Sequence, residues 1–123
     1  MNLQLFGTKK CPDTRKAERF FKERGVKLQF IDLAQKGMSP GELRNVAARV
    51  GGFEALIDRA GARYLAKGLK YAAPTGPRIE QLLVADPLLL RTPIVRAGAR
   101  ATVGYAPETW AAWLAELGPG AAR

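Results

Sequence analysis

The start of the chain carries the pattern that most restricts the fold. Residues 2–6 and 26–32 alternate polar and apolar side chains, which is typical of strands with one buried face. Between them, Pro12 opens a stretch with the period of an amphipathic helix, and Gly25 ends it. The residues expected on its inner face are Thr14, Ala17, Phe20, Phe21 and Arg24. Because strand–helix–strand connections are right-handed, we expect two parallel strands joined by this helix.

The middle of the chain, from residue 36 to about 89, predicts a helical segment inserted between sheet elements. Ser39 begins a Ser-Pro-Gly-Glu sequence, a capping box with proline at the first helical position. Apolar spacing also predicts helices at residues 53–57 and 75–84, whereas the pattern of residues 64–73 is ambiguous. This segment therefore interrupts the sheet without adding strands to it.

Strand patterns return in the last third of the chain. Residues 93–96 and 100–105 flank a short turn containing glycine, which predicts a hairpin. Pro107 opens a final helix, and we expect Trp110 and Trp113 to pack that helix on the sheet. The predicted order is β-α-β, a helical insert and then β-β-α.

Composition restricts the class of protein. The chain has 123 residues, 47% apolar and 25% charged, which suits one α/β domain over residues 1–123 with a frayed tail at 121–123. No signal-peptide pattern or membrane-length apolar run is present, so a cytoplasmic location and no membrane partner are expected. The net charge of +9 favours anionic partners. Nucleic acid is not expected, because the basic residues of the insert are scattered with few aromatics between them.

The sequence contains one cysteine and no histidine, which excludes several mechanisms. A histidine base, a Ser-His-Asp triad and a Cys-His pair are impossible. An internal disulfide cannot form, and the usual ligands of a transition metal are missing. We therefore expect no metal and no bound cofactor.

Cys11 follows the first predicted strand and directly precedes the helix that begins at Pro12. The free N–H groups and positive pole of a helix start favour a thiolate over a thiol. Lys9 and Lys10 precede Cys11 and Arg15 lies one turn on, and each cation is expected to lower the thiol pKa from about 8.5. The alternative is a small, buried and inert cysteine. The flanking cations favour the reactive thiolate.

Three segments resemble the glutaredoxin-dependent arsenate reductase (ArsC/Spx) family of thioredoxin-like proteins. GTKKCPDTRKAERFFKERGV resembles its active-site segment, and LLLRTPIVRAGARATVGYAPETWAAWL resembles its Arg-Pro-Ile-Val strand, hairpin and last helix. FEALIDRAGARY resembles the loop between them. The resemblance spans residues 2–117 and implies a thioredoxin-like fold (βαβ, helical insertion, ββα) with a mixed sheet.

The resemblance also implies roles for residues around the thiol. Cys11 would be the nucleophile, with Pro93 as the cis-proline opposite it. Lys10, Thr14 and Arg15 would help to hold the substrate, and Thr92 would present its backbone to a thiol substrate beside Pro93. Thr14 stands where the redox-switch branch has a second cysteine, so an external thiol must resolve the adduct. Glutathione or glutaredoxin is the expected reductant.

The arginines that hold the oxyanion in this family are only partly matched. Thr92 stands where the reductases have arginine before the proline, and Arg91 lies one position earlier, which on a strand means the opposite face. Arg59 is the candidate for the arginine of the middle loop, and the segment around Tyr105 offers none. Because an oxyanion beside a thiolate needs several cations or N–H donors, this departure weighs against arsenate more than against thiol exchange.

Two functions are therefore open. The first is a monothiol oxidoreductase in which Cys11 attacks a small thiol or oxyanion substrate, and glutathione or another external thiol resolves the product. A member that has lost arsenate activity and acts on another thiol substrate belongs to this class. The alternative is a non-enzymatic regulator resembling the Spx branch, which would bind RNA polymerase through the basic insert. That branch senses redox state with a cysteine pair, which Thr14 removes.

Overall fold

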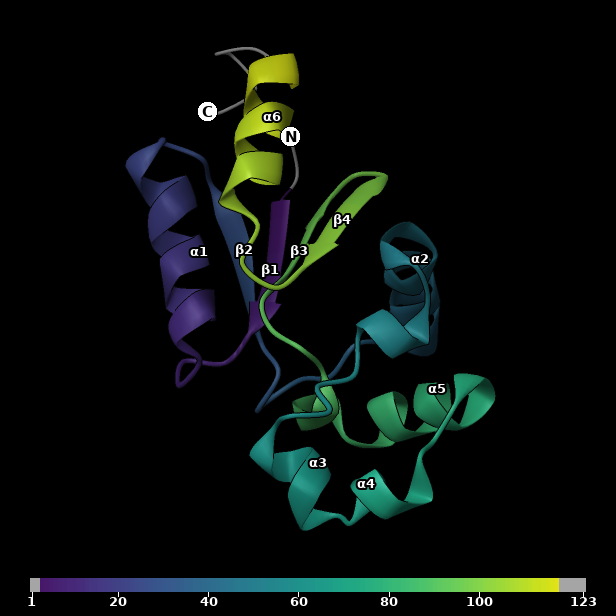
Figure 1. Ribbon diagram of the computed structural model, residues 1–123. Helices are drawn as coiled ribbons and strands as arrows, with labels where there is room; N and C mark the ends of the chain where they lie inside the picture. Colours follow the sequence, from purple (N-terminus) through teal and green to yellow (C-terminus); the bar gives the residue numbers. More distant parts are fainter. Residues whose placement is uncertain (1–2, 118–123) are drawn as a thin grey trace.

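The computed structural model describes residues 3–117 (Figure 1). Its helices and strands follow the predicted order. They are β1 (Leu3–Gly7), α1 (Pro12–Glu23), β2 (Leu28–Asp32), α2 (Pro40–Val50), α3 (Ala62–Ala66), α4 (Leu69–Ala72), α5 (Gly76–Ala85), β3 (Ile94–Ala97), β4 (Arg100–Val103) and α6 (Pro107–Leu117), with two 3₁₀ helices, η1 (Phe53–Ala55) and η2 (Pro87–Leu89). The strand start expected at Asn2 and the tail at 121–123 lie outside the described residues.

The four strands form one mixed sheet in the order β2-β1-β3-β4. β1 pairs in parallel with β2 and antiparallel with β3, and β3 pairs antiparallel with β4. Leu5 of β1 lies between Phe30 of β2 and Val95 of β3. The predicted α/β fold, with its parallel pair and its hairpin, is therefore confirmed.

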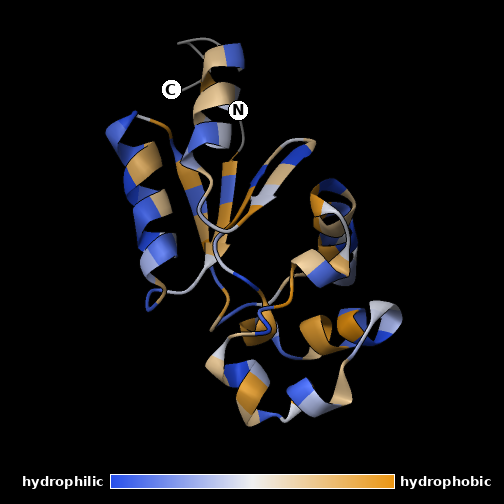
Figure 2. Ribbon diagram, in the orientation of Figure 1, coloured by the Kyte–Doolittle hydropathy of each residue, from blue (hydrophilic) through white to orange (hydrophobic). Residues whose placement is uncertain are grey.

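α1 and α6 cover one face of the sheet. Phe20 and Phe21 of α1 meet the Trp110 ring at centroid distances of 5.4 and 5.2 Å, and the Trp110 indole N–H donates to Thr102 Oγ1 at 2.8 Å. The buried side chains of this layer are Leu3, Leu5, Ala17, Phe20, Phe21, Val26, Val95, Ala97, Trp110 and Trp113. Figure 2 shows the opposite, hydrophilic side of α1 turned away from the sheet. This packing fixes the angle at which α1 begins, and therefore the position of its first residues.

Four of the five residues expected on the inner face of α1 are buried, but Arg24 is exposed. Its guanidinium lies 3.7 Å from the centre of the Phe20 ring and donates to the Phe20 carbonyl oxygen at 3.0 Å. The arginine therefore covers the edge of the apolar layer instead of entering it, since its long side chain can keep the charge in water.

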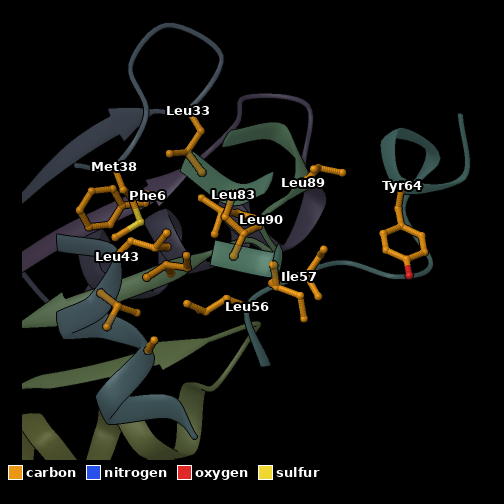
Figure 3. Packing of buried hydrophobic residues seen from close by; sticks show 14 of the residues in the cluster. Phe6, Leu33, Met38, Leu43, Leu56, Ile57, Tyr64, Leu83, Leu89 and Leu90 are labelled. Carbon is orange, nitrogen blue, oxygen red and sulfur yellow. The ribbon is translucent and has the colours of Figure 1, made fainter. Parts of the chain in front are cut away.

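The inserted helices pack on the other face and at the end where β1 finishes (Figure 1). Leu43 and Leu56 of this segment share a buried cluster with Phe6 of β1 and Ile94 of β3. Figure 3 shows much of that cluster from close by, with Phe6 and Tyr64 on opposite sides of the view. The insert thus shares its core with the sheet.

Local signals account for the helices of the insert. Ser39 Oγ accepts from the Glu42 N–H at 3.1 Å and the Ser39 N–H donates to Glu42 Oε1 at 3.0 Å, so the capping box is formed. Gly51 then ends α2 with a φ of 98°, a conformation that favours glycine. Residues 64–73, whose sequence pattern is ambiguous, form most of the two short helices α3 and α4.

Several basic residues of the insert are paired with acids. Asp86, buried at the end of α5, accepts from Arg63 at 2.7 Å and lies 3.4 Å from the Lys67 ammonium. Arg44 pairs with Glu80 at 2.6 Å. The insert therefore presents less unpaired positive charge than its sequence indicates. Within residues 3–117, none of the helices has the length and apolar character needed to span a membrane.

Candidate active site

Cys11 is the N-cap residue of α1, held between a turn and the first helical hydrogen bond. Its N–H donates to the Thr8 carbonyl oxygen at 3.2 Å, and its own carbonyl oxygen accepts from the Arg15 N–H at 3.2 Å. Pro12 follows at the first helical position, where its missing N–H costs nothing. The thiol is free and partly exposed, and its side chain makes no capping hydrogen bond to α1.

Thr92 approaches the thiol from the segment before β3. Its hydroxyl donates to Cys11 Sγ at 3.1 Å, and the Thr92 carbonyl oxygen lies 3.8 Å from the same sulfur. The peptide bond between Thr92 and Pro93 is cis, the geometry that the family resemblance implied. Two residues separated by 81 positions in the sequence therefore meet at one sulfur.

Thr14 lies one turn along α1 and is fully buried. Its hydroxyl has no hydrogen-bond partner among the described residues while Cys11 is a neutral thiol, so it is available to a thiolate. Thr14 packs closely on Gly7 at the end of β1, where an added Cβ would lie 2.4 Å from Thr14 Oγ1. Glycine at this position is what allows the threonine to sit beside the thiol.

These groups set the ionisation of Cys11. Partial burial raises the pKa of the thiol, but hydrogen bonds from the Thr14 and Thr92 hydroxyls and from the Thr14 and Asp13 N–H groups outweigh it. The pKa of Cys11 therefore lies below its usual value. This direction agrees with the lowered thiol pKa that the sequence predicted for Cys11.

The cause of the lowered pKa differs from the one predicted. Lys10 and Arg15 were expected to stabilise the thiolate by their charge, but both side chains are exposed and the groups that lower the pKa of Cys11 are hydroxyls and N–H dipoles. Water screens exposed charges, so their effect on the sulfur is small. The predicted cause, the charge of flanking cations, is therefore not among the groups that lower the pKa of Cys11.

Cys11 opens on a pocket of about 290 Å³. Four parts of the chain build it: the start of α1, the loop before α3, the segment before β3 and the segment after β4. The lining residues are Cys11, Asp13, Asp58, Arg91, Thr92, Gly104 and Tyr105. In residues 3–117, no three Cys, Asp or Glu side chains gather in a way that could hold a metal ion.

Arg91 lines this pocket, although strand alternation predicted that it would face the other way. β3 begins only at Ile94, so Arg91 lies in irregular backbone where alternation does not apply. Its N–H donates to the Leu56 carbonyl oxygen at 2.7 Å, and its guanidinium passes over Gly104, where an added Cβ would lie 3.3 Å from Arg91 Nη2. The predicted orientation of Arg91 was wrong, and the guanidinium is part of the site.

Four other predicted binding residues lie outside the pocket lining, and one of them is the buried Thr14. Arg59 donates to the Tyr64 hydroxyl at 3.0 Å and to the Pro74 carbonyl oxygen at 3.4 Å, which keeps its guanidinium within the insert. Lys10 and Arg15 are exposed, and Arg15 lines a separate groove along α1. Of the predicted cations, the structure thus brings only Arg91 to the pocket of Cys11.

Asp58, Gly104 and Tyr105 line the pocket but were not predicted as site residues. Asp58 is adjacent to Arg59, so a shift of one residue in the matching of the middle loop would have found it. Tyr105 packs against Trp110 with ring centroids 5.6 Å apart, in the segment where the family resemblance finds no matching arginine.

Comparison with known proteins places this site in a family. The chain is 28% identical to the uncharacterised protein YusI of Bacillus subtilis in an alignment of 119 positions that covers 90% of this chain and all of that protein. Its structure resembles the YFFB (PA3664) protein with a TM-score of 0.82, 27% identity and coverage of 90% of this chain and 97% of that one. A putative ArsC-related protein from Bacteroides fragilis shares the fold with a TM-score of 0.83 and 20% identity over 93% and 98% of the two chains. The model of the ArsC family matches residues 6–113, and the chain, with its thioredoxin-like fold, belongs to that family.

Proposed function

We propose that the protein is a monothiol reductase in which the Cys11 thiolate attacks a disulfide substrate. The observation that carries this proposal is the sulfur of Cys11, which faces a pocket and has two hydroxyls and two N–H groups to stabilise its charge. The thiolate is the nucleophile in thiol–disulfide exchange, so a lowered pKa increases the reactive fraction at neutral pH.

The reaction proceeds by two exchanges at sulfur. Cys11 Sγ attacks one sulfur of a disulfide R–S–S–R′, forming a mixed disulfide with R and releasing R′S⁻. An external thiol, glutathione or glutaredoxin, then attacks the sulfur of R and releases the Cys11 thiolate. A second external thiol reduces the R disulfide formed in that step. For each substrate disulfide reduced, two glutathione thiols become one glutathione disulfide.

The external thiol is part of the proposal because the chain has no other cysteine to resolve the adduct. Thr14 occupies the position of a second cysteine one turn along the helix. Its hydroxyl can stabilise the Cys11 thiolate but cannot act as the resolving thiol. The second exchange must therefore bring a thiol in through the open pocket.

Disulfides fit this pocket better than arsenate does. Arg91 is the one cation among the lining residues, and Asp13 and Asp58 add two carboxylates beside the thiolate. A multiply charged oxyanion would need several cations or N–H donors to offset this negative charge.

The test is turnover of hydroxyethyl disulfide with glutathione, NADPH and glutathione reductase. We expect the wild-type protein to consume NADPH, whereas Cys11→Ser should give only the rate without protein. Equal rates for the two proteins would refute the proposal. Parallel reactions with arsenate and glutaredoxin would show whether the oxyanion is also a substrate. If wild type is inactive and Cys11→Ser binds RNA polymerase as well as wild type, the regulatory alternative replaces the proposal.

A further inference from the structure

The pocket of Cys11 contains an acidic residue that the proposed reaction does not use. Asp58 lines the pocket from the loop before α3. Asp13, the other lining carboxylate, lies 3.9 Å from the Lys16 ammonium, whereas Asp58 forms no ion pair within residues 3–117. Asp58 therefore brings to the pocket lining a carboxylate whose charge no cation among residues 3–117 pairs with.

The backbone holds Asp58 in place at the pocket. Its N–H donates to the Leu89 carbonyl oxygen at 2.9 Å, and its Oδ1 accepts from the Ala60 N–H at 3.3 Å. Gly61 packs against the carboxylate so closely that an added Cβ would lie 2.7 Å from Asp58 Oδ2. Since asparagine can keep the Oδ1 contact, Asp58→Asn removes the charge and preserves the turn.

Arg91 faces the same pocket from the segment before β3, and within the described residues it forms no ion pair with Asp58. Neither charge is therefore cancelled by the other. With the thiolate and Asp13 included, negative groups outnumber the single guanidinium in the lining. Charges that line one pocket, itself only partly exposed to water, are screened less than charges on the open surface.

We propose that Asp58 is a specificity-determining residue that makes the site prefer disulfides carrying an ammonium group near the reacting sulfur, and disfavour anionic substrates. This inference rests on the proposed thiol–disulfide exchange at Cys11. The Asp58 carboxylate attracts an ammonium group as the disulfide approaches Sγ, and it repels a carboxylate or an oxyanion at the same place. The selected substrates are thus disulfides of aminothiols.

The test measures single-turnover exchange of Cys11 with three disulfides of similar size. Cystamine carries two ammonium groups, hydroxyethyl disulfide is neutral and 3,3′-dithiodipropionate carries two carboxylates. Each rate is divided by the rate of the same disulfide with a free thiol, which removes differences in intrinsic reactivity. The proteins are wild type, Asp58→Asn and Glu54→Gln, a control that removes one exposed charge outside the pocket lining.

We expect the preference for cystamine over dithiodipropionate to fall roughly threefold to tenfold in Asp58→Asn, as for loss of one partly screened charge pair. Glu54→Gln should keep the preference of wild type, and Arg91→Gln should increase it. An Asp58→Asn preference equal to that of Glu54→Gln would overturn the inference while leaving the reaction intact. If wild type fails to react even with the neutral disulfide, the proposed function fails, and the inference fails with it.

Discussion

Cys11, which is partly exposed, and Asp86, which is buried, are two acids whose charged forms the fold stabilises in different ways. At Cys11, burial raises the pKa, but the hydroxyls of Thr14 and Thr92 and two N–H groups outweigh it. At Asp86, burial also raises the pKa, but hydrogen bonds from Arg63 and Lys67 and the charge of Arg63 outweigh it. Both groups therefore ionise at lower pH than usual.

The difference between dipoles and cations separates a reactive group from a structural one. Asp86 forms ion pairs with Arg63 and Lys67 and caps η2 by accepting from the Leu88 N–H. These contacts hold α3 against the segment that precedes β3. The groups that lower the pKa of Cys11 carry no net charge, so the thiolate keeps its own. Such a charge remains available to an incoming electrophile. The comparison predicts that changes at Cys11 affect reactivity and that changes at Asp86 affect stability.

The largest effect is expected from Cys11→Ser. A serine oxygen cannot form the mixed disulfide that thiol–disulfide exchange requires, so the exchange rate should fall by about 1,000-fold or more. The free energy of unfolding should change by less than about 0.5 kcal/mol, because the side chain is partly exposed. Stopped-flow exchange and urea denaturation measure the two quantities. A large loss of stability would contradict the assignment of Cys11 to reactivity alone.

Gly7→Ala should affect both quantities at once. The added Cβ would meet the buried Thr14 side chain at 2.4 Å, so we expect destabilisation of about 1–3 kcal/mol from overpacking. Displacing Thr14 should also raise the pKa of Cys11. Gly41→Ala is the matched control, because no atom lies within 4 Å of its added Cβ. Equal stability of the two variants in urea denaturation would show that Thr14 is not held against Gly7.

Asp86→Ala should lower the free energy of unfolding by about 1–2 kcal/mol, through loss of the cap on η2 and of a largely buried ion-pair partner. Asp86→Asn keeps an oxygen for the cap and should cost less. Exchange at Cys11 per folded molecule should stay at the wild-type rate. A slower exchange in folded Asp86→Ala would contradict the assignment of Asp86 to stability alone.

The contribution of Asp86 should also depend on pH. Because its pKa is lowered in the folded state, its stabilisation is present above the unfolded pKa of about 3.9 and is lost as pH falls through the folded pKa. The difference in unfolding free energy between wild type and Asp86→Asn should therefore shrink on acidification below about pH 4. A difference that grows with acid would contradict the assigned sign.

How far the sequence predicts the structure depends on the range of each interaction. The strand–helix–strand start and the Ser39 capping box are local patterns, and both form as predicted. The pocket requires contacts across the fold, such as the Thr92 hydroxyl on Cys11, which only the family resemblance placed together. The predicted orientation of Arg91 was wrong because strand alternation does not hold in the irregular backbone before β3. The charge of a flanking lysine is visible in the sequence, whereas its exposure to water is not.

Asp58 and Arg59 of the middle loop show that sequence matching can also miss a site residue by one position. Arg59 matched the family by residue type, but the chain turns it toward Tyr64 and Pro74. Asp58, one position earlier, is the residue that faces the thiol pocket. The Ala60 N–H donates to Asp58 Oδ1, and this turn places Asp58, instead of Arg59, in the lining of the pocket. That choice reverses the charge at one side of the pocket.

The most direct test of this account is the pH dependence of Cys11 alkylation by iodoacetamide. Thr14→Val and Thr92→Val remove one hydroxyl each and keep the side-chain shape, and Lys10→Gln and Arg15→Gln remove one flanking charge each. We predict that each valine variant raises the pKa of Cys11 and that each glutamine variant leaves it at the wild-type value. The account is contradicted if the glutamine variants raise the pKa and the valine variants do not.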